Sequence, residues 1–527
     1  MEGQEAVVYG ILSIIPPLIA IILCIVTRQV IPALLLGIFS GVMILNAWNP
    51  GTALLDTFSK YIVGKGIADP YNAGLITFCL IIGGMVGVIN KSGGMVAIAE
   101  GIARKAKSKQ STQFAATILG TVVFIDDYAS CMITGNTMRP ITDAQNISRE
   151  KLSFIVDATA AAISSVIPVS TWIATELGLI KTGLDSVGIQ ANPLVVFVDT
   201  IPGRFYVVFL IIFMFIMLWT KRDYGPMLKA EIRARKTGEV YAKGSKPMIS
   251  DDKEIMPDPG IKGSIWHAVV PIMAFIVSTV LGLWYNGYEA GLAFKDCLGN
   301  ADASVVLTWA SGIGSMVAIL MNLLFTKMTF GKIIDSWING AKSMLYAVII
   351  LTLALTIKAV VTDLGMATYI VEATKAWLSG PVVPVLIFLI ACGTAFATGT
   401  SWGTMAILMP IAIPISWSVA GNPTEVVPLI NSTIAAVLAG AIYGDHCSPI
   451  SDTTILASLA SGSDHIAHVT TQLPYATTIA IISAIVGYIP AGFGVNPWIS
   501  IAFGTVVIYF VFKLFGKKID DHGNLIK

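Results

Sequence analysis

Long runs of apolar residues, separated by short polar segments, dominate the pattern of the chain. The clearest run extends from Phe205 to Trp219 and is closely followed by the basic pair Lys221 and Arg222. Because a helix needs roughly 20 apolar residues to cross a hydrocarbon core of ~30 Å, these runs predict about 11 transmembrane helices. They lie near residues 7–27, 30–48, 72–90, 152–180, 193–220, 265–286, 304–326, 343–361, 428–456, 470–491 and 495–516.

Two further apolar stretches, near 112–140 and 381–420, are interrupted close to their middles. The interruptions are FIDDYAS at 124–130 and ATGTSWGT at 397–404. An unwound backbone at membrane depth leaves N–H and C=O groups without partners, which is tolerated only inside the protein or beside a water-filled cavity. Each stretch is therefore predicted to be a re-entrant hairpin, which enters and leaves the membrane on one side.

The composition also indicates a membrane protein. Of the 527 residues, 55% are hydrophobic and only 12% are charged, and the formal net charge is +1. Soluble globular proteins carry roughly 25% charged residues, so this composition excludes a disordered chain, a nucleic-acid-binding surface and a large water-soluble enzyme. The sequence predicts an all-α polytopic membrane protein with about 11 transmembrane helices and two re-entrant hairpins in the lipid bilayer.

The cysteines, the histidines and the search for nucleotide-binding motifs do not predict a cofactor. The six cysteines are scattered without a CxxC pair, which argues against a disulfide framework or a zinc ribbon. No Walker motif is present, so ATP is not expected to supply energy, and we predict no cofactor. His465 and His468 lie at helical spacing beside Asp464, and we interpret them as part of a polar turn rather than a metal site.

The distribution of basic residues predicts the orientation, because positively charged loops remain in the cytoplasm. The longest polar segment, 221–263, is rich in Lys and Arg and is predicted to be a cytoplasmic linker. Threading in both directions from this linker, with two hairpins, places the N-terminus outside and the C-terminus in the cytoplasm. Most of the 33 Lys and Arg residues then lie on the cytoplasmic side of the cell (plasma) membrane.

The same threading gives the two halves of the chain opposite directions, and weak internal similarity supports a duplication. Residues 90–101 (NKSGGMVAIAEG) align with 361–373, residues 120–130 (GTVVFIDDYAS) with 393–403, and residues 154–172 with 429–447. Inverted repeats with broken helices are the means by which many secondary transporters place a binding site near the bilayer midplane.

Four segments of the chain follow from this duplication. The first inverted repeat covers 1–220, the cytoplasmic linker 221–263 and the second inverted repeat 264–491. An extra C-terminal transmembrane helix and a cytoplasmic tail occupy 492–527.

The interruption of the first hairpin contains two adjacent carboxylates, Asp126 and Asp127, with Ser130 one turn later. An ionised side chain at the membrane centre costs roughly 2.5–3.5 kcal/mol, so carboxylates at this depth indicate a function. Two charges side by side in a low dielectric repel each other, and a bound cation or proton would relieve the repulsion. Alternatively, one of the two is only a helix N-cap.

The second hairpin offers hydroxyl groups instead of charges, at Thr398, Thr400 and Ser401. Hydroxyl and carbonyl oxygens suit an alkali cation, whereas half-helix N-termini at the same break would suit an anionic group. The alternative is close packing of small residues between helices.

Each hairpin is followed by a span with a polar interruption of its own. In the first half, Ser170 and Thr171 follow Pro168, a proline that frees a backbone carbonyl. Asp157 lies three turns earlier on the same span. These residues are further candidates for the site.

In the second half, the interruption is the run YGDHCSPISDTT at 443–454. If this run is helical, Asp445, Ser448 and Asp452 share a face, and their oxygens could hold a partly dehydrated cation. We therefore expect Na+ to bind at Asp127, Asp445 and Asp452; a surface loop is the alternative for the run. His446 could titrate near neutral pH, although we favour a hydrogen-bonded structural histidine.

At these residues the chain resembles the NhaC-type sodium/proton antiporter family of the ion transporter superfamily. The resemblance covers roughly residues 30–515 and is carried by FIDDYASCMITGNTMRPITD (124–143), TGTSWGTMAILMPIAIP (398–414) and AAVLAGAIYGDHCSPISDTTILAS (435–458). It implies an inner-membrane exchanger in which scaffold helices and two re-entrant hairpins meet at the substrate site. It also implies cation or proton roles for Asp126, Asp127, Thr400, Ser401, Asp445, Ser448 and Asp452.

The resemblance leaves the substrate open, because some members of this family exchange malate, lactate or amino acids. The leading hypothesis is exchange of cytoplasmic Na+ for external H+, with both ions competing for the same carboxylates. The alternative is a Na+- or H+-coupled carrier of a small organic solute that Ser170, Thr400 and Ser401 would contact. We expect no nucleic-acid partner, and a homodimer stays open.

A membrane enzyme is the third hypothesis, from another class. It is disfavoured because HExxH is absent. In addition, Asp126 and Asp127 are adjacent rather than on facing helices, as a two-aspartate protease would need. We therefore predict that the protein is not an enzyme.

Overall fold

Residues 9–27, 29–247, 257, 261, 263–290, 292, 294, 297, 300–374 and 378–526 are described by the computed structural model. The predicted linker 221–263 is therefore described only in part, because 248–256, 258–260 and 262 lie outside the described residues.

The described residues are mostly helical. The helices of the first half are α1 (Ile15–Thr27), α2 (Val30–Leu45), α3 (Pro50–Asp56), α4 (Pro70–Lys91), α5 (Gly94–Ala103), α6 (Lys109–Val122), α7 (Asp127–Ala144), α8 (Arg149–Thr159), α9 (Ala161–Val166), α10 (Ile173–Ser186), α11 (Pro193–Thr200) and α12 (Phe205–Thr220). They are followed by α13 (Gly225–Thr237), α14 (Trp266–Asn286), α16 (Ala303–Phe325), α17 (Phe330–Ser343), α18 (Leu345–Asp363), α19 (Met366–Thr374), α20 (Val383–Thr398), α21 (Ser401–Val419), α22 (Pro428–Cys447), α23 (Asp452–Ser461), α24 (His465–Ile482), α25 (Ile489–Gly492) and α26 (Pro497–Phe515).

Short elements of other kinds connect these helices. Three 3₁₀ turns lie at Gly10–Ile14, Ile201–Gly203 and Gly380–Val382, and π-helical segments lie at Thr57–Ile67 and Ser483–Tyr488. A small antiparallel sheet joins β1 (Arg222–Asp223), β2 (Lys517–Ile519) and β3 (Leu525–Ile526) in that order. This sheet ties the start of the linker to the C-terminal tail, a contact that the sequence did not predict.

Several helices begin at the same local signal, an Asn or Asp followed by proline. The side chains of Asn49, Asp69, Asn192 and Asn496 each accept a hydrogen bond from a backbone N–H of the first turn. Proline fits directly after such a cap because the first N–H of a helix has no intrahelical partner to lose.

Eight helices of the described residues are long and apolar enough to cross a membrane. The pair Pro193–Gly203 and Phe205–Thr220, bent by 48°, makes a ninth. The prediction of an all-α multi-pass membrane protein is confirmed. Both arms of the second hairpin, α20 and α21, are among the eight, so re-entry of the hairpins stays a prediction, as do the inverted repeats and the segment boundaries.

The predicted spans 152–180 and 428–456 are not continuous helices. The first is divided into α8, α9 and α10, and the second is divided into α22 and α23. α9 and α22 each end two residues before a proline (Pro168 or Pro449), because proline cannot donate the backbone hydrogen bond that would continue the helix, whereas the break between α8 and α9 at Ala160 has no proline. The structure therefore contains fewer full-length spans than the runs of apolar residues predict.

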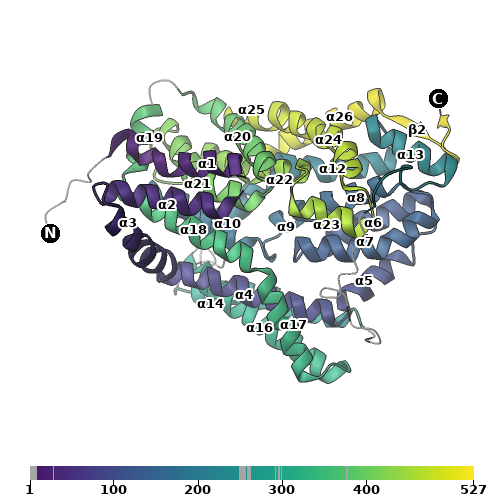
Figure 1. Ribbon diagram of the computed structural model, residues 1–527, viewed down its shortest axis with the longest axis horizontal. Helices are drawn as coiled ribbons and strands as arrows, with labels where there is room; N and C mark the ends of the chain where they lie inside the picture. Colours follow the sequence, from purple (N-terminus) through teal and green to yellow (C-terminus); the bar gives the residue numbers. More distant parts are fainter. Residues whose placement is uncertain are drawn as a thin grey trace.

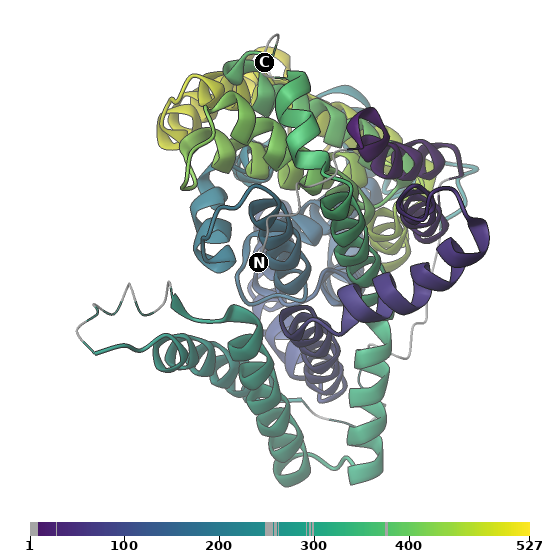
Figure 2. The ribbon, with the colours of Figure 1, turned by 90° about the vertical axis from the view of Figure 1, so that its left-hand side faces the viewer.

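The helices form two groups (Figures 1 and 2). In one group, α4 packs against α16 and α17, and α14 packs against α16. Gly340 of α17 lies so close to α4 that a Cβ atom there would be 2.2 Å from the carbonyl oxygen of Gly83. Small residues thus let these backbones approach closely, as in many membrane helix pairs. The other group contains both hairpins.

The two hairpins pack in the same crosswise manner. Each hairpin, α6–α7 or α20–α21, contacts the helix that follows it, α8 or α22. The helix after the next break packs against the hairpin of the other half. Thus α10 packs against α21, and α23 packs against α7. As a result, both breaks of each half meet near the centre of the molecule.

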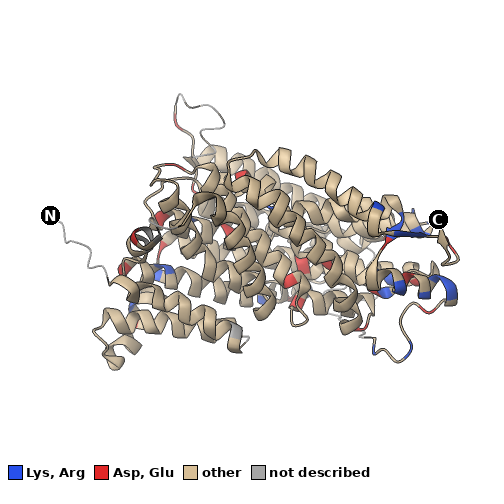
Figure 3. Ribbon diagram, turned by 90° about the horizontal axis from the view of Figure 1, so that it is seen from above, with Lys and Arg blue, Asp and Glu red and all other residues tan. Residues whose placement is uncertain are grey.

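One end of the molecule, which we name the linker face, carries α13, residues 238–247 and the three strands. Figure 3 shows Lys and Arg gathered at this end beside the C-terminus, whereas the long helical body is mostly neutral. Acidic residues lie near the middle of that body (Figure 3). Buried acids in an apolar helical body are the feature that calls for a functional explanation.

Candidate functional site

The first hairpin breaks between Val122 and Asp127, and Asp126 caps the helix that restarts there. Its Oδ1 accepts a hydrogen bond of 2.8 Å from the backbone N–H of Ala129. Its Oδ2 accepts one of 3.3 Å from the Thr171 hydroxyl, and the backbone N–H of Thr171 donates to the carbonyl of Ile125 at 2.8 Å. Thr171 therefore connects the unwound segment between α9 and α10 to the break of the first hairpin.

The side chain of Asp127, the next residue, has a different environment. It is buried, with 3% of the residue exposed, and its Oδ2 has no hydrogen-bond partner. The indole N–H of Trp172, which also lacks a hydrogen-bond partner, lies close enough to interact with this carboxylate. An unpaired carboxylate oxygen in an apolar environment is costly unless a cation or proton occupies it.

The second hairpin breaks at Gly399, whose φ of +69° is a left-handed conformation that favours glycine. α21 then begins at Ser401, where Asp445 of α22 receives two hydrogen bonds at its Oδ2. The Ser401 backbone N–H donates at 3.2 Å and the Ser401 hydroxyl at 2.7 Å. This carboxylate lies at a helix N-terminus, where the helix dipole favours negative charge.

Two more oxygens at this break have no partner in the described part of the chain. They are Oδ1 of Asp445, a residue that is 2% exposed, and the hydroxyl of Thr400. The second break therefore resembles the first: one carboxylate oxygen is held at the start of a half-helix, and another is buried without a hydrogen-bond partner among the described residues.

The run at 443–454 is not helical throughout, so the predicted shared face of Asp445, Ser448 and Asp452 is wrong. α22 ends at Cys447 and α23 begins at Asp452. The hydroxyl of Ser448 donates to the carbonyl of Phe396 at 2.8 Å. The proline that follows it, Pro449, explains why the helix cannot continue.

Asp452 nevertheless joins the site, because it links the two halves. The phenol of Tyr128, on the first hairpin, donates a hydrogen bond to Asp452 Oδ2. Asp452 also interacts electrostatically with both Asp127 and Asp445. The three residues at which we expected Na+ thus lie within one electrostatic cluster, assembled from segments more than 300 residues apart in the sequence.

Asp157 lies beside this cluster rather than within it. Its Oδ2 accepts a hydrogen bond of 2.8 Å from the side-chain amide of Gln472, on α24. It also interacts electrostatically with Asp445 and Asp452. The same amide donates to the backbone carbonyl of His446.

The remaining predicted residues stabilise the breaks. The Ser170 hydroxyl donates to the carbonyl of Ser164 at 2.6 Å, and Ser130 donates to the carbonyl of Gly120 at 3.3 Å. The Thr398 hydroxyl bonds within its own helix, to Ala395. These three hydroxyl groups are engaged by backbone carbonyls, so the structure does not bring them to the carboxylate cluster as free donors or acceptors.

His446 points toward α12, where its Nδ1 lies 2.8 Å from the Tyr206 hydroxyl. This contact agrees with the interpretation of a hydrogen-bonded structural histidine. Its Nε2 has no partner among the described residues.

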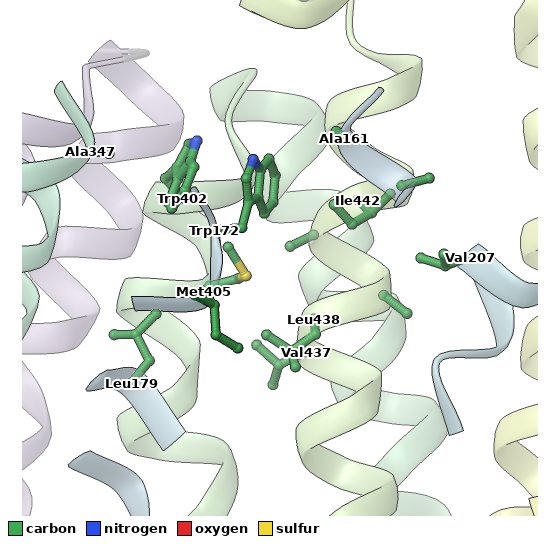
Figure 4. Close-up of a cluster of buried hydrophobic side chains, with 14 of the residues drawn as sticks. Ala161, Trp172, Leu179, Val207, Ala347, Trp402, Met405, Val437, Leu438 and Ile442 are labelled. Carbon is green, nitrogen blue, oxygen red and sulfur yellow. The ribbon is translucent and has the colours of Figure 1, made fainter. Parts of the chain in front are cut away.

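Two tryptophans meet between the two breaks (Figure 4). The ring centroids of Trp172 and Trp402 are 4.4 Å apart, and their planes differ by 38°. Figure 4 shows them above an apolar cluster that includes Met405 and Leu438. The pair thus belongs to the buried apolar cluster that lies between the two breaks.

A cavity of about 130 Å³ reaches the first break from the side of α4 and α17. Asp126 and Tyr128 line it together with Asn90 and Ser343. Asn90 is buried and its side-chain carbonyl oxygen has no partner in the described residues. The cavity is thus a polar path to the first break, bounded by both helix groups.

The chemistry of the cluster is that of oxygen donors. Within the described residues, no group of three or more His, Cys, Asp or Glu is arranged to hold a metal ion. The carboxylates of Asp127, Asp445 and Asp452 alone are therefore not arranged as a metal site, and a bound Na+ would also need hydroxyl or carbonyl oxygens.

Sequence reasoning missed three contributors. Tyr128 and Trp172 lie beside predicted residues, but nothing in a linear pattern shows that a phenol on one hairpin reaches Asp452. Gln472 had a usable signal, because an amide within the apolar run 470–491 must find a buried partner.

Comparison with known proteins gives a consistent result. Residues 165–493 match the model of the Na+/H+ antiporter family. An uncharacterized protein of Haemophilus influenzae is 35% identical over 515 residues, which is 95% of each chain. The malate-2H+/Na+-lactate antiporter of Bacillus subtilis is 37% identical over 136 residues, 22% of this chain and 28% of that protein.

Among solved structures, the YdaH transporter of Alcanivorax borkumensis has a similar fold. Its TM-score is 0.50 and its sequence identity 13%, over 85% of this chain and 90% of that chain. The family match covers more than half of the chain and includes α10, the second hairpin and the break at 448–451. The sequence resemblance is therefore confirmed, and the chain belongs to the Na+/H+ antiporter family.

Proposed function

We propose that this protein is a secondary active transporter that exports Na+ in exchange for H+ across the cell membrane. The observation that carries the proposal is the buried cluster of Asp127, Asp445 and Asp452, in which two carboxylate oxygens lack any hydrogen-bond partner among the described residues. Membership of an antiporter family supports ion exchange rather than catalysis. We retain the predicted orientation, with the N-terminus outside and the C-terminus in the cytoplasm.

Competition for the same oxygens would couple the two ions. Protonation of a carboxylate removes the charge that attracts Na+, and a bound Na+ stabilises the ionised form that has released its proton. If more protons enter than Na+ ions leave, each excess charge gains roughly 2.3 kcal/mol per 100 mV of membrane potential. The proposal therefore needs no cofactor and no nucleotide.

The crosswise packing of the hairpins supports an alternating route to the cluster. The cavity at Asp126 and Tyr128 provides an approach between α4 and α17. Since each half-helix after a break packs on the hairpin of the other half, a shift of one helix group against the other would change the access to both breaks together. This is the behaviour expected of inverted repeats around a fixed site.

Purified protein in proteoliposomes tests the proposal. An inward-acid vesicle should release protons when Na+ is added outside, and Asp127→Asn or Asp445→Asn should remove this flux. Asp199→Asn is a matched control, because Asp199 is an exposed residue on α11, away from the breaks. Undiminished Na+-dependent proton flux in both cluster variants would contradict the proposal.

A second function is favoured by one specific observation, the close, tilted ring pair of Trp172 and Trp402, of which Trp172 lies beside Asp127. Indole faces are suited to an organic solute or its cationic group, which Na+ alone does not require. One relative's name, malate-2H+/Na+-lactate antiporter, includes both ions and organic acids. The uptake of radiolabelled carboxylates and amino acids should be tested for dependence on a Na+ or H+ gradient. This second function would be favoured if the solute is taken up and if no Na+/H+ exchange occurs when the solute is absent.

A further inference from the structure

A continuous series of polar side chains leads from the linker face to buried Asp157. It begins at half-buried His465, whose Nε2 lies 2.7 Å from the carbonyl oxygen of Pro449. His465 Nδ1 lies 3.1 Å from Ser458 Oγ, which lies 2.8 Å from His468 Nδ1. His468 Nε2 lies 2.9 Å from Gln472 Oε1, and the Gln472 amide reaches Asp157.

The orientation of the Gln472 amide is fixed by its partners. Its nitrogen faces Asp157 Oδ2 and the backbone carbonyl of His446, and both of these accept hydrogen bonds. Its oxygen must therefore face His468, and His468 must carry a hydrogen on Nε2 to donate to it. The far end of the series is fixed in the same way, because the carbonyl of Pro449 can only accept from His465.

Counting hydrogens between these two fixed ends gives one proton too few for neutral side chains. The contacts from Pro449 to Gln472 form four links, and each link needs one hydrogen. Neutral His465, Ser458 and His468 together supply only three, and the Ser458 hydroxyl can instead donate its hydrogen to the backbone carbonyl of Thr454, at 2.9 Å. All four links are made only when one of the two imidazoles carries an additional proton.

We propose that His465, Ser458 and His468 form a proton relay that connects the linker face to Asp157. With the additional proton on His465, its Nδ1–H donates to Ser458 and the hydroxyl donates to Nδ1 of His468. Transfer then breaks the Nδ1–H bond of His465 as Ser458 gains that hydrogen, and the original hydroxyl hydrogen passes to Nδ1 of His468. His465 becomes neutral and His468 becomes the imidazolium, with no atom left over.

The last transfer is to Asp157. His468 Nε2 lies 3.8 Å from Asp157 Oδ2, so a shift of about 1 Å would bring the pair into hydrogen-bond range. The Nε2–H bond then breaks, the carboxylate becomes a carboxylic acid, and His468 is left neutral with its hydrogen on Nδ1. Since Asp157 interacts with Asp445 and Asp452, its neutralisation would change the charge that the cluster presents to a cation.

The charged and titratable groups around the relay fit this role. Asp157 faces His468 from α8, and His446 approaches it from α22. Asp464 caps the helix of both imidazoles and accepts a hydrogen bond from the backbone of Lys246. At Gly462, which precedes this cap, Arg149 donates to the backbone carbonyl and Arg139 lies in close contact.

This inference rests on the proposed function, because it supplies the route of its proton. It differs from the cavity that lies at Asp126 and Tyr128. Protons and the transported cation would therefore use separate paths.

Two modes of exchange test the relay in proteoliposomes: Na+/H+ exchange and proton-independent exchange of labelled Na+ for Na+. Ser458→Ala should reduce Na+/H+ exchange by roughly tenfold or more, because general acid–base groups contribute effects of this size or larger, and should leave Na+/Na+ exchange near wild type. Ser461→Ala should preserve both modes, since the hydroxyl of Ser461, on the same helix, has no partner in the described residues. Wild-type Na+/H+ exchange in Ser458→Ala, or equal loss of both modes, would overturn the relay.

An independent measurement separates this inference from the proposed function. The chain has five histidines, so ¹⁵N-histidine NMR of the full protein, with His465→Gln and His468→Gln for assignment, can report their protonation. We expect one imidazolium shared by His465 and His468, and its loss in Ser458→Ala. Two neutral imidazoles would overturn the relay, whereas a shared proton in a protein without Na+/H+ exchange would overturn only the proposed function.

Discussion

At the scale of the residue, the neighbouring carboxylates Asp126 and Asp127 differ in their hydrogen bonds. Asp126 uses both oxygens to hold the start of α7 and the Thr171 hydroxyl. Asp127, its neighbour in sequence, keeps one buried oxygen without a partner. The helix-cap interpretation therefore holds for Asp126, whereas ion binding by Asp127 stays a prediction.

This difference predicts unequal effects of the same substitution. Asp126→Asn should retain most Na+/H+ exchange, because asparagine caps a helix about as well as aspartate. Asp127→Asn should abolish exchange, because an amide cannot supply the charge that attracts a cation. The measurement is Na+-dependent proton flux, normalised to the amount of folded protein; equal loss in the two variants would contradict this prediction.

At the scale of the element, a fully buried ion pair holds the unwound segment between α9 and α10. Arg204 Nη1 lies 2.8 Å from Glu176 Oε2, and both side chains are 0% exposed. Arg204 also donates to the carbonyl of Ser165, near the end of α9. One guanidinium group therefore connects both ends of the segment that contains Thr171 and Trp172.

Breaking this pair should destabilise the protein strongly. Arg204→Met leaves Glu176 as an uncompensated buried charge, which typically costs about 3–5 kcal/mol. Adding Glu176→Met should recover much of the loss, because the isolated charge is then gone. Denaturant unfolding in detergent measures both variants, and Lys243→Met is the control, since Lys243 is 87% exposed in its pair with Glu239. A double variant less stable than Arg204→Met would contradict this account.

The break of the second hairpin gives another prediction at this scale. Gly399→Ala should destabilise the protein, because a left-handed residue with a Cβ costs roughly 1–2 kcal/mol and this Cβ would lie 2.8 Å from Ile450. Gly393→Ala, one and a half turns earlier on α20, is the matched control. A Cβ there meets nothing within 4 Å, and alanine should stabilise the helix by roughly 0.5–1 kcal/mol. Melting temperatures in detergent should shift in opposite directions; shifts of the same sign would contradict the prediction.

At the scale of the whole molecule, the linker face collects basic residues at one end of an otherwise neutral body (Figure 3). The tail strands β2 and β3 and the start of the linker are joined there into one sheet. Positively charged segments remain in the cytoplasm. The linker, the tail and the entrance of the proposed proton relay should therefore all face the cytoplasm.

Labelling of introduced cysteines tests this orientation. The six native cysteines are all buried, so they should react little with a membrane-impermeant maleimide. In intact cells, Tyr288→Cys, after α14, should be labelled, because Tyr288 is 57% exposed and is predicted to lie outside. Lys243→Cys should be labelled only after permeabilisation. The reverse pattern would show that the chain is inserted the other way.

The sequence by itself determined the class of the protein, most of its helices and the positions of the breaks. Long apolar runs predict membrane helices, and interruptions by small and polar residues such as FIDDYAS and ATGTSWGT predict breaks, so these features depend largely on local physics. The family could also be predicted from the sequence, because the polar runs at the breaks are specific enough to show the resemblance. Of the candidate site, Asp127, Thr400, Asp445 and Asp452 were all named from these runs.

Only the tertiary structure decided which oxygens are free and which are engaged. The contact of Tyr128 with Asp452 joins residues more than 300 positions apart, and no local pattern encodes it. In the sequence, His465 and His468 indicate only a polar turn. In the structure, Ser458 and Gln472, which lie on other helical turns, complete their hydrogen bonds. The physical reason is that helix formation depends on neighbours in sequence, whereas buried hydrogen bonds depend on which helices the packing brings together.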